Sequence, residues 1–181
     1  VYETALILGE AAELTITLAA IEPATVLGDW TRLRQLLLNL VTNAIKYTPR
    51  GGHVELALRH GEGTAAFAVR DTGIGIAAAD LPYIFDRFWR ADRARSRRAA
   101  DGVSTERAGV GLGLAICQWI TQAHGGTIAV TSRLTRGTTF TVSLPLPSPE
   151  ELAAAEAEAE TAGSRGVVGG AGPDYAAVTS T

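Results

Sequence analysis

Hydrophobic and polar positions along the chain follow two different periods. Leu14, Ile16 and Leu18 alternate with threonines, and this period of two predicts a half-buried strand. After Asp29, which is a typical helix N-cap, apolar residues recur every three or four positions as far as Tyr47. This spacing predicts a long amphipathic helix with one face in the core.

The rest of the pattern predicts a sheet built largely from hairpins. Alternating apolar residues flank the turn 60–63, and two further strands are expected after the glycine pair that ends a second long helix. Because neighbouring strands are joined directly rather than through helices, we expect an α+β fold, a two-layer α/β sandwich whose mixed, mostly antiparallel sheet has its helices packed on one face. The expected elements are strands over 54–58 and 65–69, helices over 80–88 and 112–124, and strands near 127–132 and 138–144.

Charge and cysteine content narrow the class of protein. The single cysteine, Cys117, excludes an intrachain disulfide, and the sequence has no cysteine–histidine cluster of the kind that binds zinc. The lone cysteine favours a reducing compartment, and no apolar run is long enough for a membrane span. We therefore expect a soluble, cytoplasmic domain without membrane contact of its own, which is compatible with a membrane-anchored parent. From Ser148 onward, six acidic residues stand against Arg165 alone. We therefore expect a folded part over 1–146 and an acidic Ala/Glu then Gly/Ser-rich tail over 147–181, a short helix followed by disorder.

Three polar residues share one stripe of the first long helix. Asn39, Asn43 and Lys46 are four and then three positions apart, beside the apolar stripe. Amide oxygens and a cation on one helical face can hold a hydrated magnesium ion and a polyphosphate, because magnesium keeps several waters and takes few protein ligands. A solvated helix face is the alternative, but asparagine is a poor helix former and gains nothing on a plain surface.

Two glycine-rich segments add a candidate nucleotide site. Asp71 follows Phe67 and Val69 on the core-facing side of its strand, where a purine amino group could donate to its carboxylate. The glycines of segment 71–76 allow a flat ligand to approach the backbone, and those of segment 109–114 precede a helix N-terminus, which favours phosphate. Neither segment is specific by itself, and no strand directly precedes the second one, as a dinucleotide-binding fingerprint requires.

A strongly basic stretch lies between these glycine-rich segments. From Asp86 to Arg107 the sequence contains seven arginines, Arg87 and Arg90 among them, against four acidic residues. A basic segment of this length between two glycine-rich hinges is typical of a mobile lid over an anionic ligand. A disordered basic loop is the alternative, and a lid that orders only when phosphate binds satisfies both.

Taken together and in this order, the motifs resemble the ATP-binding catalytic domain of sensor histidine kinases over about residues 1–146. The resemblance places the chain in the superfamily of gyrase-type, mismatch-repair and heat-shock chaperone ATPases and implies the Bergerat fold. The segments that carry it are Asn39-Leu-Val-Thr-Asn43-Ala-Ile-Lys46-Tyr47 (N box), Asp71-Thr-Gly73-Ile-Gly75-Ile76 (first glycine box), Phe85-Asp-Arg87-Phe88-Trp89-Arg90 (F box), Gly109 to Leu114 (second glycine box) and Arg136-Gly-Thr138-Thr-Phe140 (closing strand).

The resemblance implies a role for each motif. Asn43, assisted by Asn39, would hold Mg²⁺, and Lys46 would contact phosphate. Tyr47 would pack on the adenine, and Asp71 would accept a hydrogen bond from the adenine amino group. The further implied contacts are Thr138 with the base through water, the backbone amides of Gly111, Leu112, Gly113 and Leu114 with the phosphates, Gly73, Gly75, Ile76 and Gly109 with the nucleotide, and Arg87 or Arg90 with the γ-phosphate.

The activity implied by the resemblance is that of an ATP-dependent protein-histidine kinase. The domain would bind Mg²⁺–ATP and transfer the γ-phosphoryl group to a histidine on a dimerisation domain of the same parent kinase, with a response regulator downstream. His53, His60 and His124 are poor acceptors, because they occupy a strand start, a turn and a helix end. We therefore expect the acceptor histidine outside this chain.

Two alternatives stay open. An ATP hydrolase of the same superfamily would need a glutamate where Asn39 stands, because an amide cannot accept the proton of an attacking water. A nucleotide-gated binding module without transfer activity is compatible with the same motifs. Nucleic-acid binding is not expected, because the basic stretch lacks interleaved aromatic residues and the whole chain is acidic.

Overall fold

The computed structural model of the chain describes residues 1–90 and 110–164. In this part of the chain, helices and strands alternate irregularly, and five strands form one sheet. The elements in chain order are α1 (Tyr2–Ala11), β1 (Thr15–Ile21), α2 (Trp30–Tyr47), β2 (His53–Gly61), β3 (Thr64–Asp71), the 3₁₀ turn η1 (Leu81–Tyr83), α4 (Gly113–Ala123), β4 (Thr127–Arg133), β5 (Gly137–Pro145) and α5 (Pro149–Ser164).

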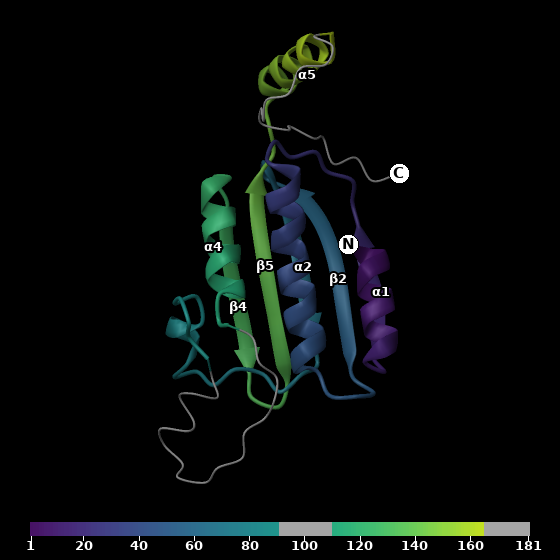
Figure 1. Cartoon of the computed structure of the whole chain (residues 1–181), viewed down its shortest axis with the longest axis vertical. Coiled ribbons are helices and arrows are strands. Elements are labelled where there is room, and N and C mark those ends of the chain that lie inside the picture. The colour runs from purple at the N-terminus through teal and green to yellow at the C-terminus, as the bar shows by residue number, and fades with distance from the viewer. Residues whose placement is uncertain (91–109, 165–181) are drawn as a thin grey trace.

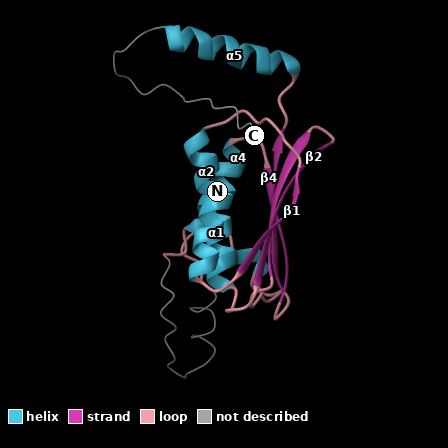
Figure 2. Cartoon of the chain, turned by 90° about the vertical axis from the view of Figure 1, so that its right-hand side faces the viewer, coloured by secondary structure: helices cyan, strands magenta, loops and turns pink. Residues whose placement is uncertain are grey.

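The sheet has its helices on one face. Its strand order is β1-β2-β3-β5-β4, with β1 parallel to β2 and every other neighbouring pair antiparallel. Figure 1 and Figure 2 show α1, α2 and α4 side by side on the same face. The predicted sandwich with a mixed, mostly antiparallel sheet is confirmed. The one parallel pair arises because α2 connects β1 to β2 as a crossover.

The core lies between α2 and the sheet. Leu36 and Leu40 of α2 are completely buried, as are Val54 of β2 and Val69 of β3. Each such side chain contributes about 1.5–3 kcal/mol when it leaves water. The predicted apolar stripe of α2 is therefore confirmed, and it fixes the rotation of the helix on the sheet.

Helix α1 is not apparent from the hydrophobic pattern. Its buried residues are Ala5 and Gly9, which are too small to mark an apolar stripe. A Cβ at Gly9 would collide with the side chain of Ile16, so α1 packs on β1 through a close approach rather than through large side chains.

The predicted helix over 80–88 is wrong. The structure has one 3₁₀ turn, η1, followed by further turns, and Asp80 makes no side-chain cap hydrogen bond. Phe88 has a left-handed backbone with φ 64°, and its N–H donates to the carbonyl of Gly111 at 2.9 Å. A contact with a distant segment thus replaces the local hydrogen bond that a helix would need.

Helix α5 lies beyond the end of β5, away from the sandwich, as Figure 2 shows. Ser148 and Glu151 form a capping box at its start: the Ser148 N–H donates to Glu151 Oε2 at 2.7 Å, and the Glu151 N–H donates to Ser148 Oγ at 3.2 Å. Residues 165–181, for which we expect disorder, lie outside the described residues. Among the described helices, none is both long and apolar enough to cross a membrane.

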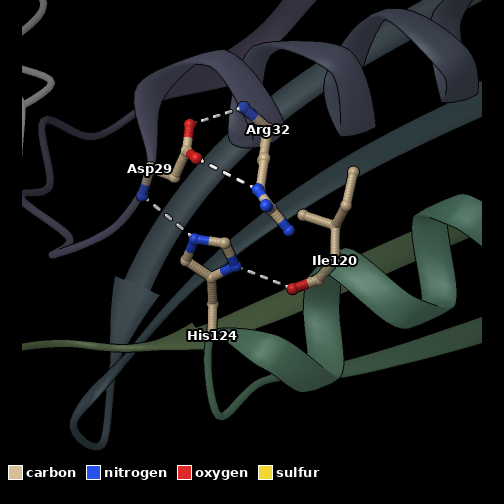
Figure 3. Close-up of polar contacts among 4 residues, drawn as sticks. All are labelled: Asp29, Arg32, Ile120 and His124. Carbon is tan, nitrogen blue, oxygen red and sulfur yellow. Dashed lines mark hydrogen bonds and ion pairs between the residues drawn. The ribbon is translucent and has the colours of Figure 1, made fainter. Parts of the chain in front are cut away.

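His124 joins α2 to α4, as Figure 3 shows. Its Nδ1 lies 2.7 Å from the carbonyl oxygen of Ile120, and its Nε2 lies 3.1 Å from the backbone nitrogen of Asp29. The Asp29 N–H can donate only to an unprotonated Nε2, so the ring carries its proton on Nδ1. Asp29 in turn caps α2 by accepting the Arg32 N–H at 3.0 Å, as predicted. The side chain of His124 therefore has a structural role.

We expect His124→Ala to destabilise the chain by about 1–2 kcal/mol, because the variant loses both hydrogen bonds of the ring. Urea unfolding followed by circular dichroism measures the change. His60→Ala is the matched control, because His60 is exposed. Equal unfolding midpoints for the two variants would contradict a structural role for His124.

Candidate functional site

A cavity of about 300 Å³ opens where the end of α2, the end of β3 and the start of α4 meet. In Figure 1 the end of α2 lies at the lower edge of the sheet, and the start of α4 is the end of that helix nearer to the same edge. The fold therefore brings together segments that are far apart in the sequence. The predicted site residues that line the cavity are Asn43, Lys46, Tyr47, Asp71, Gly75, Ile76, Arg90, Gly111, Leu112, Gly113, Leu114 and Thr138.

The end of α2 presents three kinds of polar or aromatic contact. Because the apolar stripe of α2 faces the sheet, the neighbouring stripe with Asn43 and Lys46 borders the cavity. Tyr47 is 41% exposed, and the Lys46 ammonium lies 5.1 Å from the centroid of its ring, within cation–π range. This end of the helix thus offers an amide, a cation and an aromatic face.

Asn39 lies one turn earlier on α2 and is not among the residues that line the cavity. The Sγ of Cys117 on α4 lies 3.7 Å from the carbonyl oxygen of Leu36 on α2. Burial raises the pKa of the Cys117 thiol to about 12, and the Asn39 side chain opposes that shift. A role for Asn39 beside magnesium stays a prediction.

Asp71 ends β3 with a carboxylate that is only 6% exposed. Its Oδ1 accepts hydrogen bonds from the backbone N–H groups of Gly73 at 2.8 Å and Thr138 at 3.2 Å. Burial raises the pKa of Asp71, and the two hydrogen bonds oppose this shift. Since both bonds use Oδ1, Oδ2 remains for a donor inside the cavity.

The first glycine-rich loop is held between α2 and the end of β4. The Ile74 N–H donates to the carbonyl of Tyr47 at 3.1 Å. Gly75 has φ 67°, and a Cβ there would collide with the backbone of Arg133. Gly73 does not line the cavity, but a Cβ there would collide with the Tyr47 carbonyl. Both positions need glycine for the path of the backbone.

The second glycine-rich segment leads into the N-terminus of α4. Gly111 has φ 78°, and its carbonyl accepts the hydrogen bond from Phe88. In the described part of the chain no side chain caps α4 at Leu112, so the amides of its first turn, from Gly113 onward, remain available. Such a helix start favours an anion. Gly109 lies outside the described residues.

The two arginines of the F box differ in position. Arg90 is half-buried and lines the cavity, whereas Arg87 is exposed and does not. Most of the basic stretch 86–107 lies in the segment 91–109, outside the described residues. Its role as a lid stays a prediction.

The sequence analysis assigned no role in the site to several apolar residues that line the cavity, among them Ile84, Trp89 and Phe140. Phe140 could have been found, because it follows Thr138 by two positions on β5 and so faces the same side of the sheet. Ile84 and Trp89 lie in irregular backbone that no periodicity predicts. Asp80, also missed, adds a second carboxylate to the lining.

Comparison with known sequences assigns these segments to one family. The family model described as histidine kinase-, DNA gyrase B-, and HSP90-like ATPase matches residues 28–148. The chain is 44% identical over 119 residues to the sensor histidine kinase RppB of Synechocystis, and this match covers 66% of the chain and 24% of RppB. It is 43% identical over 134 residues to the sensor-like histidine kinase SenX3 of Mycobacterium tuberculosis, and this match covers 74% of the chain and 31% of SenX3. The chain thus spans about a quarter to a third of the length of these relatives.

Solved structures share the fold. The mycobacterial sensor histidine kinase MprB superposes with a TM-score of 0.65 and 26% identity, over 80% of this chain and 91% of that chain. Full-length ShkA in complex with AMPPNP superposes with a TM-score of 0.67 and 32% identity, over 81% of this chain and 28% of that chain. The catalytic domain of the histidine kinase ThkA gives a TM-score of 0.64 at 26% identity, over 83% of this chain and 92% of that chain. These likenesses confirm the predicted Bergerat fold.

We expect Asp71→Asn to raise the melting temperature at neutral pH by a few degrees, since about 1 kcal/mol moves a domain of this size by roughly that much. The amide keeps an acceptor for Gly73 and Thr138 but carries no buried charge. The pKa of Asp71 in the folded state is raised above 3.8. Its buried charge therefore lowers the free energy of unfolding once the pH rises through that pKa, and this loss disappears when the carboxylate is protonated.

The melting temperatures of the parent and the variant should therefore differ at neutral pH. They should converge below about pH 4, near the ordinary carboxyl pKa. Asp86→Asn is the control, because Asp86 is exposed. An Asp71→Asn variant that is less stable than the parent at neutral pH would show that the burial cost is not the dominant effect.

Proposed function

Because the chain belongs to the histidine kinase-, DNA gyrase B-, and HSP90-like ATPase family, as a catalytic domain of the sensor histidine kinase type, we propose that it binds Mg²⁺–ATP and transfers the γ-phosphoryl group to a histidine of another domain. The observation that supports this best is the convergence of the N box, both glycine boxes and the F box on one cavity. That cavity is lined by both a carboxylate and a helix start, which suits a ligand with a base and an anionic tail.

At the base end, adenine lies against Tyr47 and the apolar residues that line the cavity in the proposed complex. Its amino group donates to Oδ2 of Asp71, the carboxylate oxygen that the backbone leaves open. Thr138 borders the same part of the cavity. An apolar surface with a few placed polar groups is the usual composition of a nucleobase pocket.

At the phosphate end, Lys46, Arg90 and the first-turn amides of α4 supply positive charge and donors. Asn43 offers an amide oxygen, and residues 1–90 and 110–164 contain no group of three or more His, Cys, Asp or Glu side chains that could hold a metal. This donor set fits magnesium, which takes few protein ligands and keeps water and phosphate oxygens. When bound, the ion neutralises charge on the phosphates.

The proposed transfer needs no base from this chain. An unprotonated ring nitrogen of the acceptor histidine attacks the γ-phosphorus, and a P–N bond forms as the bond to the β–γ bridging oxygen breaks and ADP leaves. The proton on the other ring nitrogen passes to an acidic residue beside the acceptor. Lys46, Arg90 and the α4 amides stabilise the charge of the transferring group. The acceptor histidine, its dimerisation domain and the response regulator lie outside this chain in the proposal.

The position of Asn39 supports transfer over hydrolysis. A hydrolase of this superfamily would use a glutamate there to take a proton from water, which an amide cannot do. Asn39 is also not among the residues that line the cavity. Rapid ATP hydrolysis by the isolated chain, unaffected by Asn39→Asp, would favour the hydrolase.

Incubation of the chain with γ-labelled ATP and the dimerisation domain of its parent protein tests the transfer. We expect acid-labile phosphate on that domain, because a phosphoramidate bond to histidine hydrolyses in acid. Tight ATP binding without any label on the domain would instead favour a nucleotide-gated binding module.

We expect Asn43→Ala to abolish magnesium-dependent ATP binding, a loss of about a hundredfold or more in affinity, because a charge-assisted contact is removed from the cavity. Isothermal calorimetry with and without magnesium measures this loss. Thr42→Ala is the matched control, because Thr42 is exposed and its hydroxyl donates to the backbone of its own helix. An unchanged ATP affinity in Asn43→Ala would refute the assigned role.

A further inference from the structure

Ser132 of β4 connects three parts of the base end of the cavity. Its Oγ accepts a hydrogen bond from the backbone N–H of Ile76 at 2.8 Å. The same oxygen lies 3.0 Å from the carbonyl oxygen of Gly137 and 2.8 Å from Oγ1 of Thr138. Thr138 is only 7% exposed and lines the cavity, whereas Ser132 is not among the lining residues.

The single proton of Ser132 determines the direction of these bonds. If Ser132 donated to Thr138, its oxygen and the Gly137 carbonyl oxygen would face each other at 3.0 Å without a proton between them. If Ser132 donates to Gly137, then Thr138 donates to Ser132, and each short contact contains one proton. The second arrangement satisfies every partner, and a buried polar network is stable only when all its members are satisfied.

In this arrangement the hydroxyl proton of Thr138 points away from the cavity. Its lone pairs are then left for the cavity, which is also lined by Asp71, a carboxylate that only accepts when ionised. We propose that Ser132 is a positioning residue that fixes Thr138 as a hydrogen-bond acceptor, and that this selects a nucleobase with an amino group over one with a keto oxygen. The inference rests on the proposed function and adds the origin of its base specificity.

A merely structural role for Ser132 makes a different prediction. Its bond to Ile76 also anchors the first glycine-rich loop, so the loss of Ser132 could weaken every purine nucleotide equally. The ratio of affinities for two bases separates the roles: loss of the loop anchor weakens binding of both bases alike, whereas a turn of the Thr138 proton toward the cavity favours a keto group and disfavours an amino group.

The test measures dissociation constants of the full chain for ATP and for inosine triphosphate, which has a keto oxygen in place of the amino group. In Ser132→Ala the Thr138 proton is free to turn toward the cavity and donate to that oxygen. We expect the preference for ATP over inosine triphosphate to fall by about tenfold, the effect of one hydrogen bond. Thr131→Ala is the matched control, because Thr131 is exposed and adjacent on β4, and it should keep the parent ratio.

If Ser132→Ala does not fold, Thr138→Val tests whether the Thr138 hydroxyl accepts or donates a hydrogen bond in the cavity. With Thr138 as an acceptor, the valine variant loses more affinity for ATP than for inosine triphosphate, so the preference for ATP falls. With Thr138 as a donor to the cavity, the preference would rise, and this result would overturn the inference. If folded Ser132→Ala keeps the parent's ratio of affinities for ATP and inosine triphosphate, the inference is also overturned. A parent chain that binds neither nucleotide would instead overturn the proposed function.

Discussion

A buried carboxylate that depends on backbone donors determines the layout of the site. Asp71 Oδ1 accepts from Gly73, in the loop that leaves β3, and from Thr138, its register partner on β5. A carboxylate at 6% exposure is costly without such donors. The pairing of β3 with β5 supplies one of them, and the glycine loop supplies the other. These two hydrogen bonds therefore fix three features together: the register of the sheet, the path of the loop and the direction of the open carboxylate oxygen.

Helix α2 links the stability of the fold to the geometry of the site. Leu36 and Leu40 fix its rotation on the sheet, and this rotation directs Asn43 and Lys46 toward the cavity. At the other end of the helix, His124 holds the N-cap against α4. Because α4 starts at the cavity, the contact between the two helices also sets the distance between Asn43 and Lys46 of α2 and the first-turn amides of α4. Core packing and ligand geometry are thus parts of one arrangement.

The sequence pattern predicts the fold wherever local periodicity coincides with burial, as in α2, the β2–β3 hairpin and α4. It fails where distant contacts replace local ones. Helix α1 packs through Gly9, which marks no stripe, and the N–H of Phe88 bonds Gly111 instead of extending a helix. The motifs predict most of the cavity lining in the same way, because they lie at the ends of regular elements. The apolar residues Ile84 and Trp89 lie in irregular backbone, so only the three-dimensional structure places them.

The direction of a hydroxyl proton is a property that no sequence motif contains. Thr138 could be identified as a site residue from its motif, but whether it donates or accepts depends on Ser132, which lies across the β4–β5 hairpin. Ser132 in turn is constrained by the carbonyl of Gly137 and the amide of Ile76. The hydrogen-bonding character of the proposed base end therefore arises from the sheet and the glycine loop together. A rigid network of this kind can discriminate between bases, because it cannot reorient cheaply to suit a different hydrogen-bonding pattern.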